Sequence, residues 1–390
     1  MSCVLPYTNI EARTDGTISV CCIMQDHAKK PDGTSYNLAK GDTITDVLNS
    51  KWLANYRRQF AKGAKPKACS NCWHEENAGL QSKRLRENKF WEKHGTDTLL
   101  SLDLKLGNIC NSKCRICTSF ASSQWVPEEV KIDPEKAPLY KNRNKLGQWP
   151  ETNEDFWTDI DNHLPSVKKL EFYGGEPLLI DRHLEILEKC IEIGVAKDIQ
   201  VTYNTNGSIP LSDKFINLWK NFKHIEIFFS IDDVYNRFNY IRHPGDFFKV
   251  IENLQQYKNL ELDRTKGSYA VSVFQTISIL NICDIMELTN YIHEYVDKKT
   301  NIHYNMVFTP MHMSPKALPK KAKEYILDRF NHAPTYVEPI LEFIRNEDYP
   351  EEAIKTFVNL TKHSDMYRKE SFVDTFPTLY SLIKEYWDEQ

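Results

Sequence analysis

The sequence lacks the long hydrophobic runs of a membrane protein or an exported precursor. No stretch approaches the roughly 18 uninterrupted apolar residues of a membrane-spanning helix. The first twenty residues include Asn9, Glu11, Arg13 and Asp15, where a signal peptide would be apolar. We therefore expect a cytoplasmic protein that makes no membrane contact.

An excess of positive charge is also absent. The 50 Lys and Arg residues are outnumbered by 54 Asp and Glu residues, for a formal net charge of −4 at pH 7. A protein whose main task is to bind phosphate backbones usually carries a basic field. Nucleic acid is therefore not expected among the partners.

Repeats and low-complexity tracts are missing as well, which indicates folded globular domains. Hydrophobic residues make up 41% and charged residues 27% of the 390 residues, as is ordinary for globular proteins. One core usually stops growing at about 250–300 residues. We expect a cysteine-bearing unit at 1–97, an α/β region at 98–310 and a helical carboxy-terminal extension at 311–390.

Ten cysteines stand out against these absences. Without an export signal they are expected in a reducing compartment, where disulfides are rare. Metal-binding or catalytic thiols are the better explanation.

Six short segments rich in β-branched and aromatic residues predict strands, at 98–106, 168–173, 198–204, 223–231, 269–280 and 301–308. Segments with helical spacing lie between several of them, such as 182–193. Strands alternating with helices predict an α/β sheet or barrel whose ligand site lies at the carboxyl ends of the strands.

Three cysteines follow the first predicted strand directly, in "LDLKLGNICNSKCRICTSF". Cys110, Cys114 and Cys117 have the spacing CxxxCxxC, which lets one loop place three thiolates around an iron–sulfur cluster. Full thiolate ligation takes four cysteines. Three ligands leave one iron position open, as catalytic metal sites do. A zinc site with a fourth ligand from elsewhere, or buried structural cysteines, are the alternatives.

A second motif, "EFYGGEPLL", ends the second predicted strand with Gly174, Gly175, Glu176 and Pro177. Glycine backbone can approach a ligand closely. In this order and strand context the two motifs resemble the radical S-adenosylmethionine (radical SAM) enzymes. The resemblance implies a partial (β/α)6 TIM-like barrel, a SAM-binding [4Fe–4S] cluster and SAM. It also implies reductive cleavage of SAM to a 5′-deoxyadenosyl radical that abstracts a substrate hydrogen atom.

The resemblance also implies SAM contacts at the strand ends. Glu176 would pair with the SAM ammonium, and polar residues at later strand ends would contact the SAM carboxylate and ribose. Those residues are Asn204 and Asn206 in "YNTNG" and Ser230 and Asp232 in "FSIDD". Arg242 could pair with a carboxylate bidentately. A tight turn and solvated loops are the alternatives. Ile116 stands where the family commonly has an aromatic residue, so we assign its side chain no role.

Four more cysteines lie in the amino-terminal unit. Cys3, Cys21, Cys69 and Cys72 would complete a closed [4Fe–4S] or zinc site. A glycine followed by four residues and Cys21 resembles the SPASM and twitch modules of peptide-modifying radical SAM enzymes. This module precedes the barrel and has too few cysteines for two clusters, so we expect one auxiliary [4Fe–4S] cluster. Zinc is the alternative metal, and Cys22 is the alternative ligand to Cys21.

The resemblance implies an oxidoreductase or maturase that acts on a peptide or protein side chain and receives electrons from a flavodoxin or ferredoxin. Cross-linking, dehydrogenation and epimerisation all begin with the same abstraction, and the sequence does not choose among them. Cys283, just past the fifth predicted strand, could return a hydrogen atom to a substrate radical; a packed thiol is the alternative. The other functions left open are a radical SAM enzyme for a small molecule or nucleoside, and a non-catalytic iron–sulfur or zinc-binding interaction protein.

Overall fold

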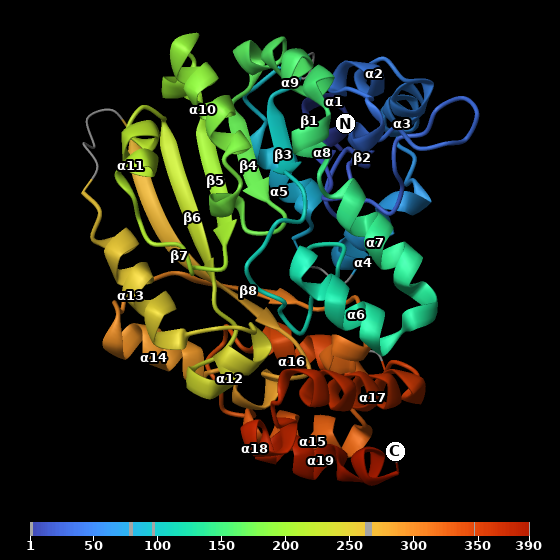
Figure 1. Ribbon diagram of the computed structural model, residues 1–390, viewed down its shortest axis with the longest axis vertical. Coiled ribbons are helices and arrows are strands. Elements are labelled where there is room, and N and C mark those ends of the chain that lie inside the picture. Colours follow the sequence, from blue (N-terminus) through green and yellow to red (C-terminus); the bar gives the residue numbers. More distant parts are fainter. Residues whose placement is uncertain (1–2, 78–80, 96–97, 262–266, 347, 390) are drawn as a thin grey trace.

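The computed structural model describes residues 3–77, 81–95, 98–261, 267–346 and 348–389. Residues 96–97, at which the predicted boundary between the first two parts falls, lie outside this set. Within the described residues an eight-stranded sheet is flanked by helices, which confirms the predicted α/β class (Figure 1).

The sheet has the order β2-β1-β3-β4-β5-β6-β7-β8. Every neighbouring pair is parallel except β1 and β2, which are antiparallel. The strands are β1 (Asn9–Ala12), β2 (Ile18–Ser19), β3 (Ser101–Lys105), β4 (Lys169–Tyr173), β5 (Gln200–Thr205), β6 (His224–Ser230), β7 (Ser268–Ile277) and β8 (Ile302–Met306). The six predicted strands correspond to β3 to β8, and their sequential order is that of the predicted open barrel.

Helices precede, connect and follow the strands. Those up to β3 are α1 (Leu5–Thr8), α2 (Ile44–Leu48), α3 (Lys51–Ala61), α4 (Ser70–Asn77) and α5 (Lys83–Phe90). Those between β3 and β8 are α6 (Val126–Ile132), α7 (Ala137–Leu146), α8 (Trp149–Thr152), α9 (Glu154–Asp161), α10 (Arg182–Glu192), α11 (Asp213–Trp219), α12 (Tyr235–Ile241), α13 (Phe247–Lys258) and α14 (Glu287–Tyr295). Those after β8 are α15 (Lys320–Arg329), α16 (Glu338–Arg345), α17 (Glu351–Arg368), α18 (Phe372–Thr375) and α19 (Pro377–Asp388).

The two faces of the sheet differ because apolar and polar residues alternate along the strands. Leu102, Leu104, Leu170 and Phe172 belong to the main hydrophobic core, which also includes buried residues of the flanking helices such as Leu184. The residues between them point to the opposite face. On β3 and β4 that face is polar, although parallel sheets are usually apolar on both sides.

The amino-terminal unit extends the sheet. Ile10 of β1 lies opposite Leu102 of β3 in a parallel ladder, and β2 adds the edge strand. The sheet therefore runs across the predicted boundary near residue 97.

The carboxy-terminal helices enclose a second hydrophobic cluster and are grouped beside one end of the sheet (red in Figure 1). Residues of β7 and of the loop after it, such as Ile277 and Ile279, belong to this cluster. None of the helices in the described part of the chain is long and apolar enough to cross a bilayer.

Candidate metal centres

The loop after β3 carries the three predicted ligands of the SAM-binding cluster. Cys114 is buried, whereas Cys110 and Cys117 are half-buried. A hydrogen bond from the Cys117 thiol, together with the nearby Arg242 guanidinium, lowers the pKa of Cys114. Burial raises the pKa of Cys110 to about 12. Three thiols in one short loop fit a cluster that is held by three cysteines.

Nitrogen donors surround these sulfurs. The backbone N of Ser112 lies 3.4 Å from Cys110 Sγ, and Asn206 Nδ2 lies 4.0 Å from the same atom. Arg242 Nη1 lies 4.0 Å from Cys114 Sγ. Donors in such positions stabilise negative charge on cluster sulfurs and tune the reduction potential. Two predicted SAM contacts, Asn206 and Arg242, thus lie next to the predicted ligands.

The glycine pair packs directly on the cysteine loop. The backbone N of Glu176 donates to the carbonyl oxygen of Ile109 at 2.8 Å. A Cβ on Gly175 would lie 1.9 Å from that same oxygen, and Gly174 has a φ of +110°. No other residue type fits here without moving the loop or the turn. The two motifs therefore meet, as the resemblance implies.

The Glu176 carboxylate lies inside the protein. It is fully buried and accepts hydrogen bonds from Thr205 Oγ1 at 2.8 Å, Asn206 N at 2.6 Å and Leu178 N at 3.1 Å. Burial raises its pKa to about 7. This carboxylate joins the turn, in which Pro177 is also buried, to the end of β5. The contact between Glu176 and the SAM ammonium that the resemblance implies stays a prediction.

The remaining predicted SAM contacts divide into two kinds. Asp232 is 1% exposed, and its carboxylate accepts hydrogen bonds from Arg242 Nε at 2.8 Å and Thr276 N at 2.9 Å. Its side chain therefore orients Arg242. Asn204 and Ser230 are half-buried at the ends of β5 and β6 and lie on the polar face of the sheet.

All four predicted auxiliary ligands line one cavity. Cys3, Cys21, Cys69 and Cys72 share it with apolar side chains, and its empty volume is about 400 Å³, open solvent included. Lys83 and Arg84 also line it and place positive charge beside the thiols. Across the described residues, no three Cys, His, Asp or Glu side chains converge on a position for a single metal ion. Four cysteines around one cavity are the donor set of a closed iron–sulfur or zinc site.

The structure separates Cys21 from its neighbour. Cys21 is buried and lines the cavity, whereas Cys22 is exposed and has Lys83, Asp103 and Lys105 as charged neighbours. The cavity thus presents Cys21, in keeping with the glycine spacing in the sequence.

Cys283 is packed in the hydrophobic cluster beneath the carboxy-terminal helices and is 1% exposed. Burial raises the pKa of its thiol to about 12, and its charged neighbours are Asp284 and Arg329. Neither of these lies in the cysteine loop. The burial fits the packed-thiol alternative, and the role of Cys283 as a hydrogen-atom donor stays a prediction.

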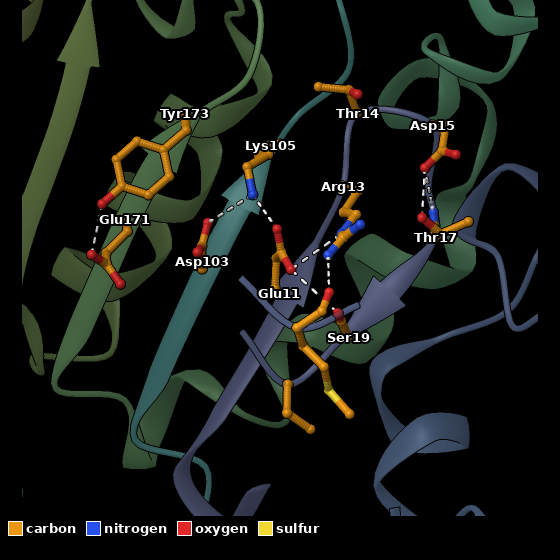
Figure 2. A network of polar contacts seen from close by, with 12 residues as sticks. Glu11, Arg13, Thr14, Asp15, Thr17, Ser19, Asp103, Lys105, Glu171 and Tyr173 are labelled. Carbon is orange, nitrogen blue, oxygen red and sulfur yellow. Dashed lines mark hydrogen bonds and ion pairs between the residues drawn. The ribbon is translucent and has the colours of Figure 1, made fainter. Parts of the chain in front are cut away.

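Sequence reasoning missed a row of charged residues on the polar face of the sheet (Figure 2). Glu11, Asp103 and Glu171 lie opposite one another on β1, β3 and β4. Lys105 contacts Glu11 and Asp103, and Arg13 contacts Glu11. Within the described residues neither Asp103 oxygen has a hydrogen-bond partner, and burial raises the pKa of Asp103 to about 7. The alternation of polar residues with leucines in β3 is the sequence feature from which this charged row could have been predicted.

This charged row lies between the two candidate centres. Cys3 precedes β1, and Cys21 follows the antiparallel β2, so both lie at the amino ends of the parallel strands. The three-cysteine loop follows the carboxyl end of β3. The two centres are therefore at opposite ends of the sheet.

Comparison with known protein families agrees with this arrangement. Residues 104–288 match the radical SAM superfamily, and residues 3–73 match an iron–sulfur cluster-binding domain, SPASM. Residues 104–288 therefore carry a radical SAM domain, and residues 3–73 carry a SPASM domain. The cofactors of the protein are a SAM-binding [4Fe–4S] cluster, S-adenosylmethionine and auxiliary iron–sulfur. The predicted resemblance is confirmed.

Solved structures with some likeness include native anSMEcpe with bound AdoMet, at 17% identity and a TM-score of 0.36, covering 64% of this chain and 62% of that one. Streptococcus suis SuiB bound to precursor peptide SuiA has 13% identity and a TM-score of 0.37, covering 92% and 75%. TYW1 with a lysine–pyruvate adduct has 10% identity and a TM-score of 0.32, covering 72% and 90%. The chain thus spans about three fifths of the first structure's length. No curated protein sequence matches it.

Proposed function

We propose that the protein cleaves SAM reductively and abstracts a hydrogen atom from a peptide or protein side chain, as an oxidoreductase or maturase. The observation that carries the proposal is the contact between the cysteine loop and the glycine-pair turn, through Glu176 N and Ile109 O. The peptide substrate is supported by the SPASM match over 3–73, because the resemblance links this module to peptide-modifying enzymes.

We assign Cys110, Cys114 and Cys117 as ligands of the SAM-binding cluster. When bound and reduced, that cluster supplies the electron that splits SAM into methionine and a 5′-deoxyadenosyl radical. Arg242 and Asn206 place N–H groups beside two of the thiolates. The absence of side chains at Gly174 and Gly175 lets the turn pack directly against the cysteine loop. Asn204 and Ser230 remain candidates for polar SAM contacts.

We assign Cys3, Cys21, Cys69 and Cys72 to one auxiliary [4Fe–4S] cluster. Lys83 and Arg84 partly offset the negative charge of four thiolates in a mostly apolar cavity. A flavodoxin or ferredoxin is the proposed reductant.

Anaerobic reconstitution followed by reaction with SAM and dithionite tests this function. We expect about eight irons per chain, for two cubic clusters, and formation of 5′-deoxyadenosine. Cys117→Ala should abolish 5′-deoxyadenosine while retaining about four irons. Zinc-loaded protein without SAM cleavage would favour a structural metal protein instead.

Deuterium transfer tests the substrate class. A peptide substrate with deuterated side chains should yield deuterated 5′-deoxyadenosine. Candidate peptides are best taken from short reading frames beside the gene. Transfer from a deuterated nucleoside or other small molecule, with none from any such peptide, would contradict the peptide assignment while leaving the SAM chemistry in place.

A further inference from the structure

The residues between the three cysteines are held by a distant part of the chain. Arg115, between Cys114 and Cys117, is 8% exposed. Its Nη2 donates to Asp365 Oδ1 at 2.6 Å and to Glu370 Oε2 at 2.5 Å, and these residues lie 250 and 255 positions further along. One buried guanidinium thus links the cysteine loop to the end of α17 and to the turn after it.

Both carboxylates are fixed by further contacts. Asp365 Oδ1 also accepts from the Tyr240 hydroxyl at 2.6 Å, and Asp365 Oδ2 accepts from Phe372 N at 2.6 Å. Glu370 Oε1 lies 2.6 Å from His243 Nδ1. The Arg115 guanidinium lies over the Tyr240 ring, 3.8 Å from its centre. Asp365 and Glu370 are therefore held around the Arg115 guanidinium by contacts of their own, and we call this group of residues the Arg115 socket.

A second link connects α17 to the other side of the loop. Arg368 Nε donates to both oxygens of Glu128 at 3.0 and 2.9 Å, and the two side chains are fully buried. Lys113 Nζ, between the first two cysteines, lies 2.9 Å from the same carboxylate. Arg368 also lies over the Trp125 ring, whose Nε1 donates to the carbonyl oxygen of Cys114 at 3.1 Å.

The loop backbone is bound as well. Lys113 N donates to His243 O at 2.6 Å, and Arg115 N donates to Ile241 O at 2.7 Å. These bonds lay the loop along the end of α12. The two bonds are made by the backbone N–H groups of Lys113 and Arg115. The side chains of both residues therefore remain available for the carboxylates of α6 and of the end of α17.

We propose that the carboxy-terminal helical segment is a brace for the cysteine loop, and that Arg115 is the positioning residue through which it acts. The catalytic importance of the brace rests on the proposed function. A cluster held by three thiolates is fixed by fewer bonds than a closed one, so groups behind the ligands must set the loop geometry. This gives residues 311–390, which carry no sequence motif, a role in the reaction.

Alkylation of the metal-free chain tests the brace without any cluster. The rates at which N-ethylmaleimide labels Cys110 and Cys117 are followed by peptide mass spectrometry in wild type, Arg115→Ala and Arg115→Lys. We expect about a tenfold faster rate in Arg115→Ala, as for the loss of a charged hydrogen bond, and a rate near wild type in Arg115→Lys. The control is Arg345→Ala, which removes an exposed guanidinium bonded to Glu338 and should change no rate. Labelling of Cys69 should be the same in every variant.

The reconstituted protein gives a second readout. The electron paramagnetic resonance spectrum of the reduced cluster with SAM should change in Arg115→Ala and return in Arg115→Lys. If Arg115→Ala melts as wild type does, yet shows unchanged labelling and an unchanged spectrum, the brace is wrong. If Arg115→Ala does not fold, Glu370→Gln decides the question, because it weakens one of the two links and keeps Asp365. A wild type that never cleaves SAM would refute the proposed function and leave the labelling comparison valid.

Discussion

Among single residues of the site, Gly175 tolerates a side chain least, because its backbone packs directly against the cysteine loop. An alanine there would place Cβ 1.9 Å from Ile109 O, so the cysteine loop and the turn must move apart. We expect Gly175→Ala to lower the rate of 5′-deoxyadenosine formation by about a hundredfold, the usual effect of a misplacement near 1 Å. Gly95→Ala is the matched control, since among the described residues, chain neighbours aside, no atom lies within 4 Å of the added Cβ. Equal rates in the two variants would contradict the proposed contact.

Substitution of Cys21 and of its neighbour Cys22 should have different effects on the iron content. Cys21→Ala should lower the iron content by about four atoms per chain, because it removes a ligand that lines the cavity. Cys22→Ala should leave the iron content unchanged. Iron and sulfide analysis after reconstitution measures both, and the reverse result would move the ligand assignment to Cys22.

The raised pKa of Asp103 predicts how the stability of the protein depends on pH. Burial raises its pKa from 3.8 to about 7, so between these values the folded chain holds a proton that the unfolded chain releases. Stability therefore falls as the pH rises through this window. Asp103→Asn should reduce the loss in unfolding free energy between about pH 5 and pH 8 by on the order of 1–2 kcal/mol, measured by urea denaturation. The exposed Asp155 provides the control substitution, and identical pH profiles for Asp103→Asn and wild type would refute the prediction.

Residue spacing in the sequence was enough to find the cysteines and the glycine pair, because each motif is local. It did not show that the Glu176 carboxylate bonds to Thr205 and Asn206, which lie 29 and 30 positions away. It also gave no hint of Arg115, whose partners follow it by 250 residues and more. Contacts at such separation depend on the tertiary fold.

At the scale of elements, α6 and α17 are joined by the fully buried pair of Glu128 and Arg368. Glu128→Ala leaves the Arg368 charge buried without its carboxylate, so we expect a loss of about 3–5 kcal/mol in unfolding free energy. Chemical denaturation measures this loss. The double variant Glu128→Leu with Arg368→Met should be less destabilised than Glu128→Ala. A double variant as unstable as the single one would show that packing, not unpaired charge, sets the cost.

The strands that the sequence predicted are β3, in which leucines alternate with polar residues, and β4 to β8, which contain β-branched or aromatic residues. β1 and β2 were missed because they contain four and two residues, and "NIEA" has little β-propensity. Their place in the sheet comes from pairing with β3. Residues 44–61 form two helices, α2 and α3, because Ser50 caps the start of α3, where its side-chain oxygen accepts a hydrogen bond from Leu53 N.

At the scale of the whole molecule, the shared sheet predicts that the amino-terminal unit and the barrel unfold together. Cys72 and Cys190 report on the two parts, and both are buried. In metal-free chain at increasing urea, the two thiols should become reactive to alkylation over the same range. Labelling of Cys72 at clearly lower urea than Cys190 would show that the first unit opens independently.

The brace also bears on biogenesis. Arg115 is held by Asp365 and Glu370. During synthesis the three-cysteine loop therefore lacks these contacts until residue 370 has been added to the chain. The SPASM cavity draws all four of its cysteines from residues 3–72 and has its ligands at hand much earlier. We therefore expect the amino-terminal cysteines to be ready for iron earlier in synthesis than the three-cysteine loop, and a chain that ends before Asp365 to lack the brace.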